Sequence, residues 1–94
     1  WLMTLVESNA HNSGKKGHID HANLYIRAIA DMLDVKLIDQ QENGYITKQN
    51  SFLYGHEECN ESSLKLTAIH PNLKGHDLMM RLIVDEFYKN LPQT

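Results

Sequence analysis

Two segments of this 94-residue chain repeat their apolar residues at the spacing of an α-helix, and they constrain its fold more than any other feature. The first predicts a helix from His18 to about Asp34. Its apolar face consists of Ile19, Ala22, Ile26, Ile29, Ala30 and Leu33. The second predicts a helix that begins near Asn72 or Gly75 and ends before Pro92. Its inward face consists of Leu78, Met79, Leu82, Ile83, Phe87 and Leu91, opposite a solvent-exposed charge ladder of Arg81, Asp85 and Lys89.

Short apolar runs between polar segments predict three strands. These strands cover residues 1–7, 35–38 and 64–70. A polar loop, residues 8–17, follows the first strand, and Asn43-Gly44 is a hairpin signal after the second. Residues 45–54 are expected to form a protruding excursion.

The order of these elements is strand, helix, strand, long excursion, strand and helix, which predicts a single α+β domain over residues 1–94. The predicted architecture is a ferredoxin-like or PII-like sandwich, with two helices on one face of a small antiparallel sheet. That fold usually has a fourth strand, for which the segments up to Thr94 offer no counterpart.

The composition narrows the classes of partner and the compartment. The formal net charge is −3 and the lysines are scattered, which disfavours nucleic-acid binding. No apolar run approaches the roughly 20 residues of a membrane-spanning helix, so we expect no membrane partner. The single cysteine, Cys59, excludes an internal disulfide and suits a reducing compartment, so we expect a cytoplasmic protein. We expect no cofactor.

The stretch Gly55–Pro71 concentrates reactive side chains ahead of the third predicted strand. It contains three carboxylates, the cysteine and two hydroxyls: Glu57, Glu58, Glu61, Cys59, Ser62 and Ser63. A rigid strand can hold such a cluster for binding, although glutamates in a loop are more often simply solvated. Two pairs, His18 with His21 and His56 with Cys59, allow a zinc site. Sites with one cysteine are less common than sites with two to four, and we expect no metal.

The turn before the last helix resembles the acyl-CoA-binding turn of GNAT-family acetyltransferases through Lys74 and Gly75. The resemblance implies a pyrophosphate held by the amides of the helix start. Asp77 and Met79 stand where that family has glycines or small residues, and the carboxylate would repel pyrophosphate. A degenerate acyl-CoA-dependent acetyltransferase is therefore an alternative function.

The layout of nearly the whole chain resembles the phage-encoded S-adenosylmethionine hydrolase/lyase family. The features that carry the resemblance are the strand end Leu5-Val6-Glu7-Ser8-Asn9, the helix start Gly17-His18-Ile19-Asp20-His21, the turn Asn43-Gly44-Tyr45, the strand entry Glu61-Ser62-Ser63-Leu64 and the last helix. The resemblance implies degradation of S-adenosylmethionine to methylthioadenosine and homoserine lactone or homoserine. It also implies a PII-like homotrimer with sites between subunits.

That chemistry needs a carboxylate for the substrate ammonium, an aromatic ring for the adenine or sulfonium, and polar loop groups. The candidate catalytic carboxylates are Glu61, as first choice, and Glu58. The candidate substrate-binding residues are Tyr45, Tyr54, Ser8 and Asn9. Each has a structural alternative, since tyrosines can pin an excursion and Ser8 and Asn9 can simply end a strand. A non-catalytic PII-like ligand sensor or interaction module is a further alternative.

Overall fold

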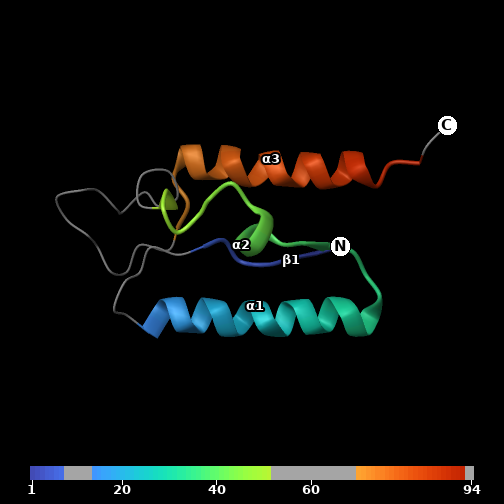
Figure 1. The fold of residues 1–94 in the computed structure, drawn as a ribbon, viewed down its shortest axis with the longest axis horizontal. Helices are drawn as coiled ribbons and strands as arrows, with labels where there is room; N and C mark the ends of the chain where they lie inside the picture. Colours follow the sequence, from blue (N-terminus) through green and yellow to red (C-terminus); the bar gives the residue numbers. More distant parts are fainter. Residues whose placement is uncertain (8–13, 52–69, 93–94) are drawn as a thin grey trace.

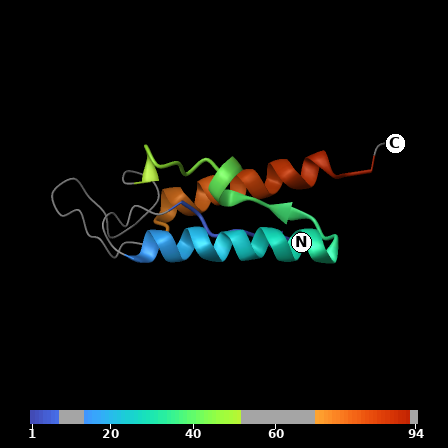
Figure 2. The ribbon, with the colours of Figure 1, turned by 60° about the horizontal axis from the view of Figure 1, so that its bottom comes forward.

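The computed structural model describes residues 1–7, 14–51 and 70–92 of the chain. Within these ranges, a small sheet lies between two long helices, and a short helix follows the second strand (Figures 1 and 2). The elements are β1 (Leu2–Met3), α1 (Gly14–Leu33), β2 (Leu37–Ile38), α2 (Gln40–Asn43) and α3 (Leu73–Lys89).

The strands β1 and β2 pair in parallel, with Leu2 opposite Leu37 and Met3 opposite Ile38. The Leu2 amide donates to the Lys36 carbonyl at 2.9 Å, and the Thr4 amide donates to the Ile38 carbonyl at 3.0 Å. Neighbouring parallel strands need a crossover that returns the chain to the same end of the sheet, and α1 supplies it. The first half of the chain is therefore a β-α-β unit.

The predicted ferredoxin-like or PII-like sandwich is wrong. That fold places a third strand between the first two and makes neighbouring strands antiparallel, whereas β1 and β2 are hydrogen-bonded directly and run in the same direction. The two long helices also lie on opposite sides of the sheet instead of sharing one face (Figure 1). The strand predicted for residues 64–70 lies outside the described residues except for His70.

Helix α2 stands where the sequence predicted a hairpin turn. The Asp39 carboxylate caps this helix by accepting the Glu42 amide at 3.1 Å. Gly44 then has φ −73°, so it does not adopt the left-handed conformation that an Asn-Gly hairpin turn needs. A Cβ at this position would lie 2.1 Å from the Gln40 carbonyl oxygen, so glycine is required for close approach to α2.

Helix α3 begins at the predicted cap, because the Asn72 side chain accepts the Gly75 amide at 2.7 Å. Its buried side includes Leu82, as predicted. Phe87 and Leu91 were expected on the same side, but they are 46% and 56% exposed. Phe87 instead packs edge-to-face on Trp1, with ring centres 4.7 Å apart, so the buried stripe is narrower than the apolar periodicity indicated.

Buried apolar residues of the described ranges come from every layer of the fold: Val6, Ala30, Ile38, Ile46 and Leu82. Polar residues share this interior, and Asn23 of α1 is fully buried. Its side-chain amide accepts the Leu5 N–H at 2.7 Å and donates to the Leu5 carbonyl at 3.0 Å. Asn23 thus bonds to the end of β1 as a neighbouring strand would. None of the described helices is long and apolar enough to cross a membrane.

We expect Asn23→Ala to lower the free energy of unfolding by about 2–4 kcal/mol, because it leaves the part-buried N–H and C=O of Leu5 unpaired and removes the bond to Gln41. Urea titration of both proteins measures the loss. Asn43→Ala removes the same amide from an exposed position and should stay within about 0.5 kcal/mol of the unchanged protein. Equal stabilities for the Asn23 and Asn43 variants would contradict the role given to Asn23.

Candidate functional site

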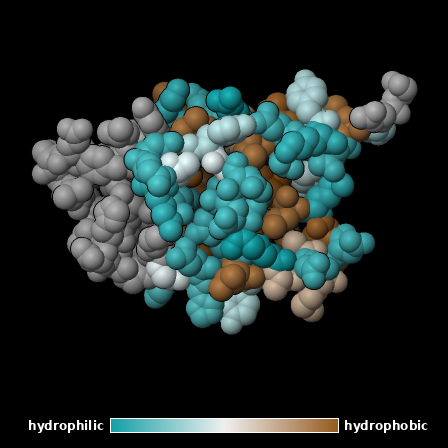
Figure 3. All heavy atoms as spheres, in the orientation of Figure 1, coloured by the Kyte–Doolittle hydropathy of each residue, from teal (hydrophilic) through white to brown (hydrophobic). Residues whose placement is uncertain are grey.

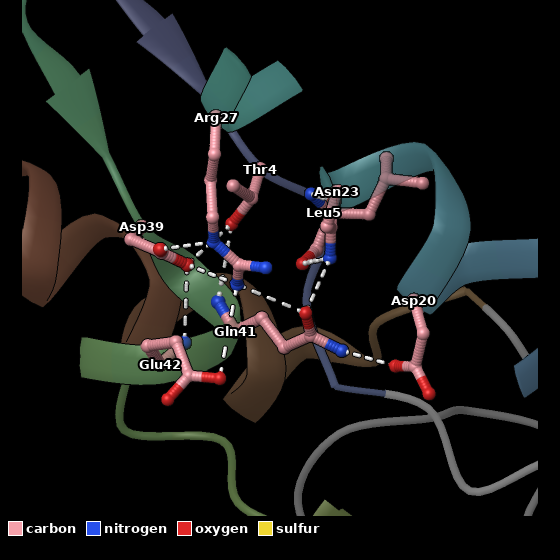
Figure 4. A network of polar contacts seen from close by, with 8 residues as sticks. All are labelled: Thr4, Leu5, Asp20, Asn23, Arg27, Asp39, Gln41 and Glu42. Carbon is pink, nitrogen blue, oxygen red and sulfur yellow. Dashed lines mark hydrogen bonds and ion pairs between the residues drawn. The ribbon is translucent and has the colours of Figure 1, made fainter. Parts of the chain in front are cut away.

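A network of polar contacts gathers where β1 and β2 end (Figure 4). The Asp39 carboxylate accepts two hydrogen bonds from Arg27, from Nε at 2.7 Å and from Nη2 at 3.0 Å. It also accepts the Thr4 hydroxyl at 3.0 Å and the Glu42 amide at 3.1 Å. A single carboxylate therefore joins the middle of α1, the end of β1 and the start of α2.

Gln41 extends these contacts, which we call the Asp39 network (Figure 4). Its side-chain oxygen accepts from Arg27 and from Asn23, each at 3.0 Å. Its side-chain nitrogen donates to Asp20 at 2.5 Å, and its backbone amide donates to the Thr4 hydroxyl at 3.2 Å. The side-chain amide of Gln41 thus has its acceptor and one donor engaged on α1.

The electrostatics of the network follow from these contacts. Partial burial by itself raises the pKa of Asp39, but the hydrogen bonds from Arg27, Glu42 and Thr4 and the charge of Arg27 together bring it below its ordinary 3.8. The hydrogen bond to Asp39 likewise raises the pKa of Arg27 above its ordinary value. Both side chains are therefore charged at neutral pH and oriented toward each other.

The Asp39 network is a scaffold more than a binding site. Its central carboxylate already accepts four hydrogen bonds, and the hollow beside it, lined in part by Asp20, Arg27 and Lys48, measures about 260 Å³. Small-molecule sites usually begin at about 300 Å³. What the network fixes is α2, and through α2 the residues that follow it.

The Asp39 network positions Tyr45 against α3. The buried Gln40 side chain of α2 donates to the Met79 carbonyl of α3 at 2.9 Å, and Asn50 donates to the Tyr45 carbonyl at 2.9 Å. The Tyr45 hydroxyl donates to the Asp85 carboxylate, and the Arg81 guanidinium lies 4.3 Å from the centre of the Tyr45 ring. Tyr45 is therefore held at three places: its backbone carbonyl, its hydroxyl and one face of its ring.

A hollow of about 650 Å³ lies beside this ring, and we call it the Tyr45 hollow. It is lined by Asn43, Tyr45, Leu82, Asp85, Glu86, Tyr88 and Lys89. The hydrogen bond to Asp85 raises the pKa of Tyr45 above 10.0, so the phenol stays protonated at neutral pH. Glu86 lies 3.3 Å from Lys89. Two carboxylates, two phenol rings and one ammonium group therefore surround a volume within the usual range of small-molecule sites.

This arrangement suits a cationic organic ligand. Tyrosine rings attract cations through their π-faces, and the Arg81 group on Tyr45 is an instance of that attraction within the protein itself. Asp85 and Glu86 carry two negative charges against the one positive charge of Lys89 in the lining. The lining is thus negative and partly aromatic, and the Arg81 charge lies outside it against the Tyr45 ring.

Of the predicted site residues, Tyr45 is the one that the structure describes, and it lies in the hollow. The others, Glu58, Glu61, Tyr54, Ser8 and Asn9, lie outside the described residues. The sequence interpretation missed Asp85, Glu86 and Tyr88. It assigned Asp85 to a solvent-exposed ladder from its spacing to Arg81 and Lys89, and no local pattern connects Asp85 with a tyrosine 40 positions earlier.

Two alternatives from the sequence can be compared with the described residues. His21 stacks on Tyr25 with ring centres 5.2 Å apart, and His56 and Cys59 of the proposed zinc set lie outside the described ranges. No group of three metal-ligating side chains gathers in the part of the chain that the structure describes. In the acetyl-CoA alternative the helix amides hold pyrophosphate, but the Gly75 amide is already bound by Asn72.

The chain was compared with protein-family models, curated proteins and solved structures, and none of them matches it.

The lowered pKa of Asp39 makes a testable contribution to acid stability. A carboxyl whose pKa is lower in the folded chain stabilises the fold above its unfolded value, near 3.8, and this contribution is lost as the pH falls through the folded value. Asp39→Asn removes the titrating group and its partnership with Arg27. We expect the variant to be less stable at neutral pH and to lose less stability between about pH 5 and pH 2.

Urea titrations at several pH values measure both effects. Asp77→Asn, an exposed change of the same kind on α3, should keep the neutral stability and the acid slope of the unchanged protein. An Asp39→Asn variant with the full acid slope would show that another carboxyl is responsible.

Proposed function

We propose that the Tyr45 hollow binds a cationic small molecule, and that the protein degrades S-adenosylmethionine to methylthioadenosine and homoserine lactone or homoserine. The observation that carries the proposal is the position of Tyr45, expected from the sequence to contact this substrate, beside Asp85 and Glu86 in a hollow of about 650 Å³. The substrate has a sulfonium and an ammonium group, and the hollow offers carboxylates and rings to both.

The proposed reaction disperses charge. In the lyase form, the substrate's own carboxylate attacks the methylene next to the sulfonium, the carbon–sulfur bond breaks, and its electron pair stays on sulfur. The sulfonium and carboxylate charges are both lost, which gives uncharged methylthioadenosine and a homoserine lactone that keeps its ammonium group, so a site that excludes water favours the step. In the hydrolase form, water attacks the same carbon and gives up a proton, and homoserine forms. Holding the substrate folded, with its carboxylate near the methylene, is a proximity effect in the lyase form.

The remaining roles follow the sequence resemblance and stay proposals. Glu61, with Glu58 as second choice, would hold the substrate ammonium, Tyr54 would add a second ring, and Ser8 and Asn9 would contact the ribose or carboxylate. A homotrimer with sites between subunits, in the cytoplasm, belongs to the same proposal. Light scattering tests the trimer directly.

Incubation with S-adenosylmethionine and detection of methylthioadenosine tests the activity. We expect turnover by the unchanged protein and roughly tenfold weaker binding by Asp85→Asn, because the variant can still accept the Tyr45 hydroxyl but has lost its charge. Calorimetric titration measures the affinity. Asp77→Asn removes a charge from an exposed position of the same helix and should bind within about twofold of the unchanged protein.

The outcomes separate the alternatives. Absence of both binding and turnover sinks the proposal. Binding without turnover, kept in Glu61→Gln, would indicate a non-catalytic ligand sensor. Binding of acetyl-CoA, lost on changing Lys74, would favour the acetyltransferase alternative.

A further inference from the structure

Strand β1 has one edge that pairs with no strand among the described residues, and we call it the open edge. The Leu2 and Thr4 amides donate to β2, and in a parallel ladder the residue between two such positions faces the other way. The N–H and C=O of Met3 therefore face the open edge. The next such pair, at Leu5, is bonded by the Asn23 side chain. An edge that presents backbone groups in this way can pair with a further strand.

A groove of about 230 Å³ lies along the open edge. Its lining consists of Met3, Thr4, Leu5, Val6, Ile19, Pro71 and Met79, which are apolar except for Thr4 and include no residue of β2. The side chains of Met3 and Leu5 are 38% and 48% exposed. An added strand suits such a place, because its backbone pairs with the edge and its side chains fill the apolar groove.

Both long helices expose apolar side chains beside the open edge. On α1, Leu33 lies two seven-residue repeats after Ile19, which lines the groove, so the two share one face, and Leu33 is 63% exposed. On α3, Met79 lines the groove, and the half-exposed Phe87 packs on Trp1 at the start of β1. Because α1 and α3 lie on opposite sides of the sheet (Figure 1), they would cover both faces of a strand at the open edge, as is usual in parallel sheets.

The outer edge of β2 is the alternative position for a further strand. Helix α2 follows β2 directly and lies on that side of the sheet (Figures 1 and 2). Polar side chains cover much of the described surface there (Figure 3). The open edge of β1, with its apolar groove, therefore gains more from a partner than the outer edge of β2 does.

The position of Pro71 identifies the partner of the open edge. Residues 52–69 lie outside the described ranges, and the described chain resumes at residue 70, directly before Pro71 in the groove. The alternating apolar residues of 64–70 predict a strand for that segment. A strand that ends at residue 70 therefore ends beside the open edge.

The contacts of α3 give the direction of this strand. Phe87, near the end of α3, packs on Trp1 at the start of β1, whereas Pro71, just before α3, shares the groove with Val6. Helix α3 therefore runs antiparallel to β1 (Figure 1). A strand that ends at residue 70 is joined to α3 by two residues, and so short a connection reverses the direction of the chain between a strand and the helix packed on its sheet. Such a strand runs parallel to β1.

We propose that residues 64–70 form a third strand that pairs with Met3 at the open edge and runs parallel to β1. The strand order is then β2, β1 and the third strand, with β1 in the centre. The chain is long enough for this arrangement. A seven-residue strand spans about 23 Å, and the extended segment 52–63, which leads to its start from Ser51, spans up to about 40 Å.

Amide hydrogen exchange, followed by NMR, tests the pairing at Met3. We expect the Met3 amide to exchange at least tenfold more slowly than an unprotected amide, and Leu66→Asp to remove this protection, because a carboxylate does not fit a strand covered by two helices. The Thr4 amide, bonded to the Ile38 carbonyl, should stay protected in the variant. Leu73→Asp is the matched control at a leucine that is 82% exposed, and it should leave Met3 protected.

Two results would overturn the inference directly: fast exchange of the Met3 amide in the unchanged protein, or protection of Met3 that survives Leu66→Asp. Protection that disappears on dilution would overturn it as well. Pairing within one chain does not depend on concentration, so that result would assign the open edge to a second copy of the chain.

A spin label tests the direction of the strand without changing an apolar position. The label is attached at Lys65→Cys in a Cys59→Ser background, so that it has one site of attachment. In a parallel strand, residue 65 lies beside the start of β1, about 13 Å from residue 69. We expect the label to broaden the indole signal of Trp1 at least twice as strongly as the amide signal of Val6. Stronger broadening of Val6, or none of either signal, would contradict the parallel strand.

Discussion

The pairing of Arg27 with Asp39 is the interaction on which the rest of the described structure depends. The sheet is too small to hold three helices by itself, because each strand contributes two residues. Asp39 compensates by joining α1, the end of β1 and α2 through one carboxylate, and its side chain is 11% exposed. Hydrogen bonds between charged groups in such surroundings are stronger than those between neutral groups, and the two-pronged contact with Arg27 also fixes direction. The Arg27–Asp39 pair therefore fixes how α1, the sheet and α2 lie relative to one another.

Sequence periodicity predicted the helices well because each helix contains its own signal. The 3.6-residue repeat located α1 and α3, and the cap at Asn72 was recognisable from its residue type. The start of α1 at Gly14 instead of His18 lay in a polar segment without apolar spacing. The direction of the strands was missed because two-residue strands carry almost no pattern, and parallel pairing depends on which strands become neighbours, which no local signal encodes.

The sequence likewise predicted one residue of the candidate site and missed another. Tyr45 was identified as a ring that could contact a ligand, and it lines a hollow of about 650 Å³. Asp85 was assigned to solvent because its helical spacing to two basic residues suggested a surface ladder. Its contact with Tyr45 spans 40 positions of sequence and exists because α2 turns the chain toward α3. Long-range contacts between polar side chains depend on the assembled fold, so sequence periodicity gives them no signature.

The close approach at Gly44 has a consequence for how this surface can vary. A side chain there would meet the Gln40 carbonyl at 2.1 Å, which is shorter than any stable contact, so the chain would have to move away from α2. The residue that would move with it is the adjacent Tyr45. The shape of the hollow therefore depends partly on Gly44, which has no side chain and does not line the hollow. A chain with a different residue 44 could keep every group that surrounds the hollow and still lose their arrangement.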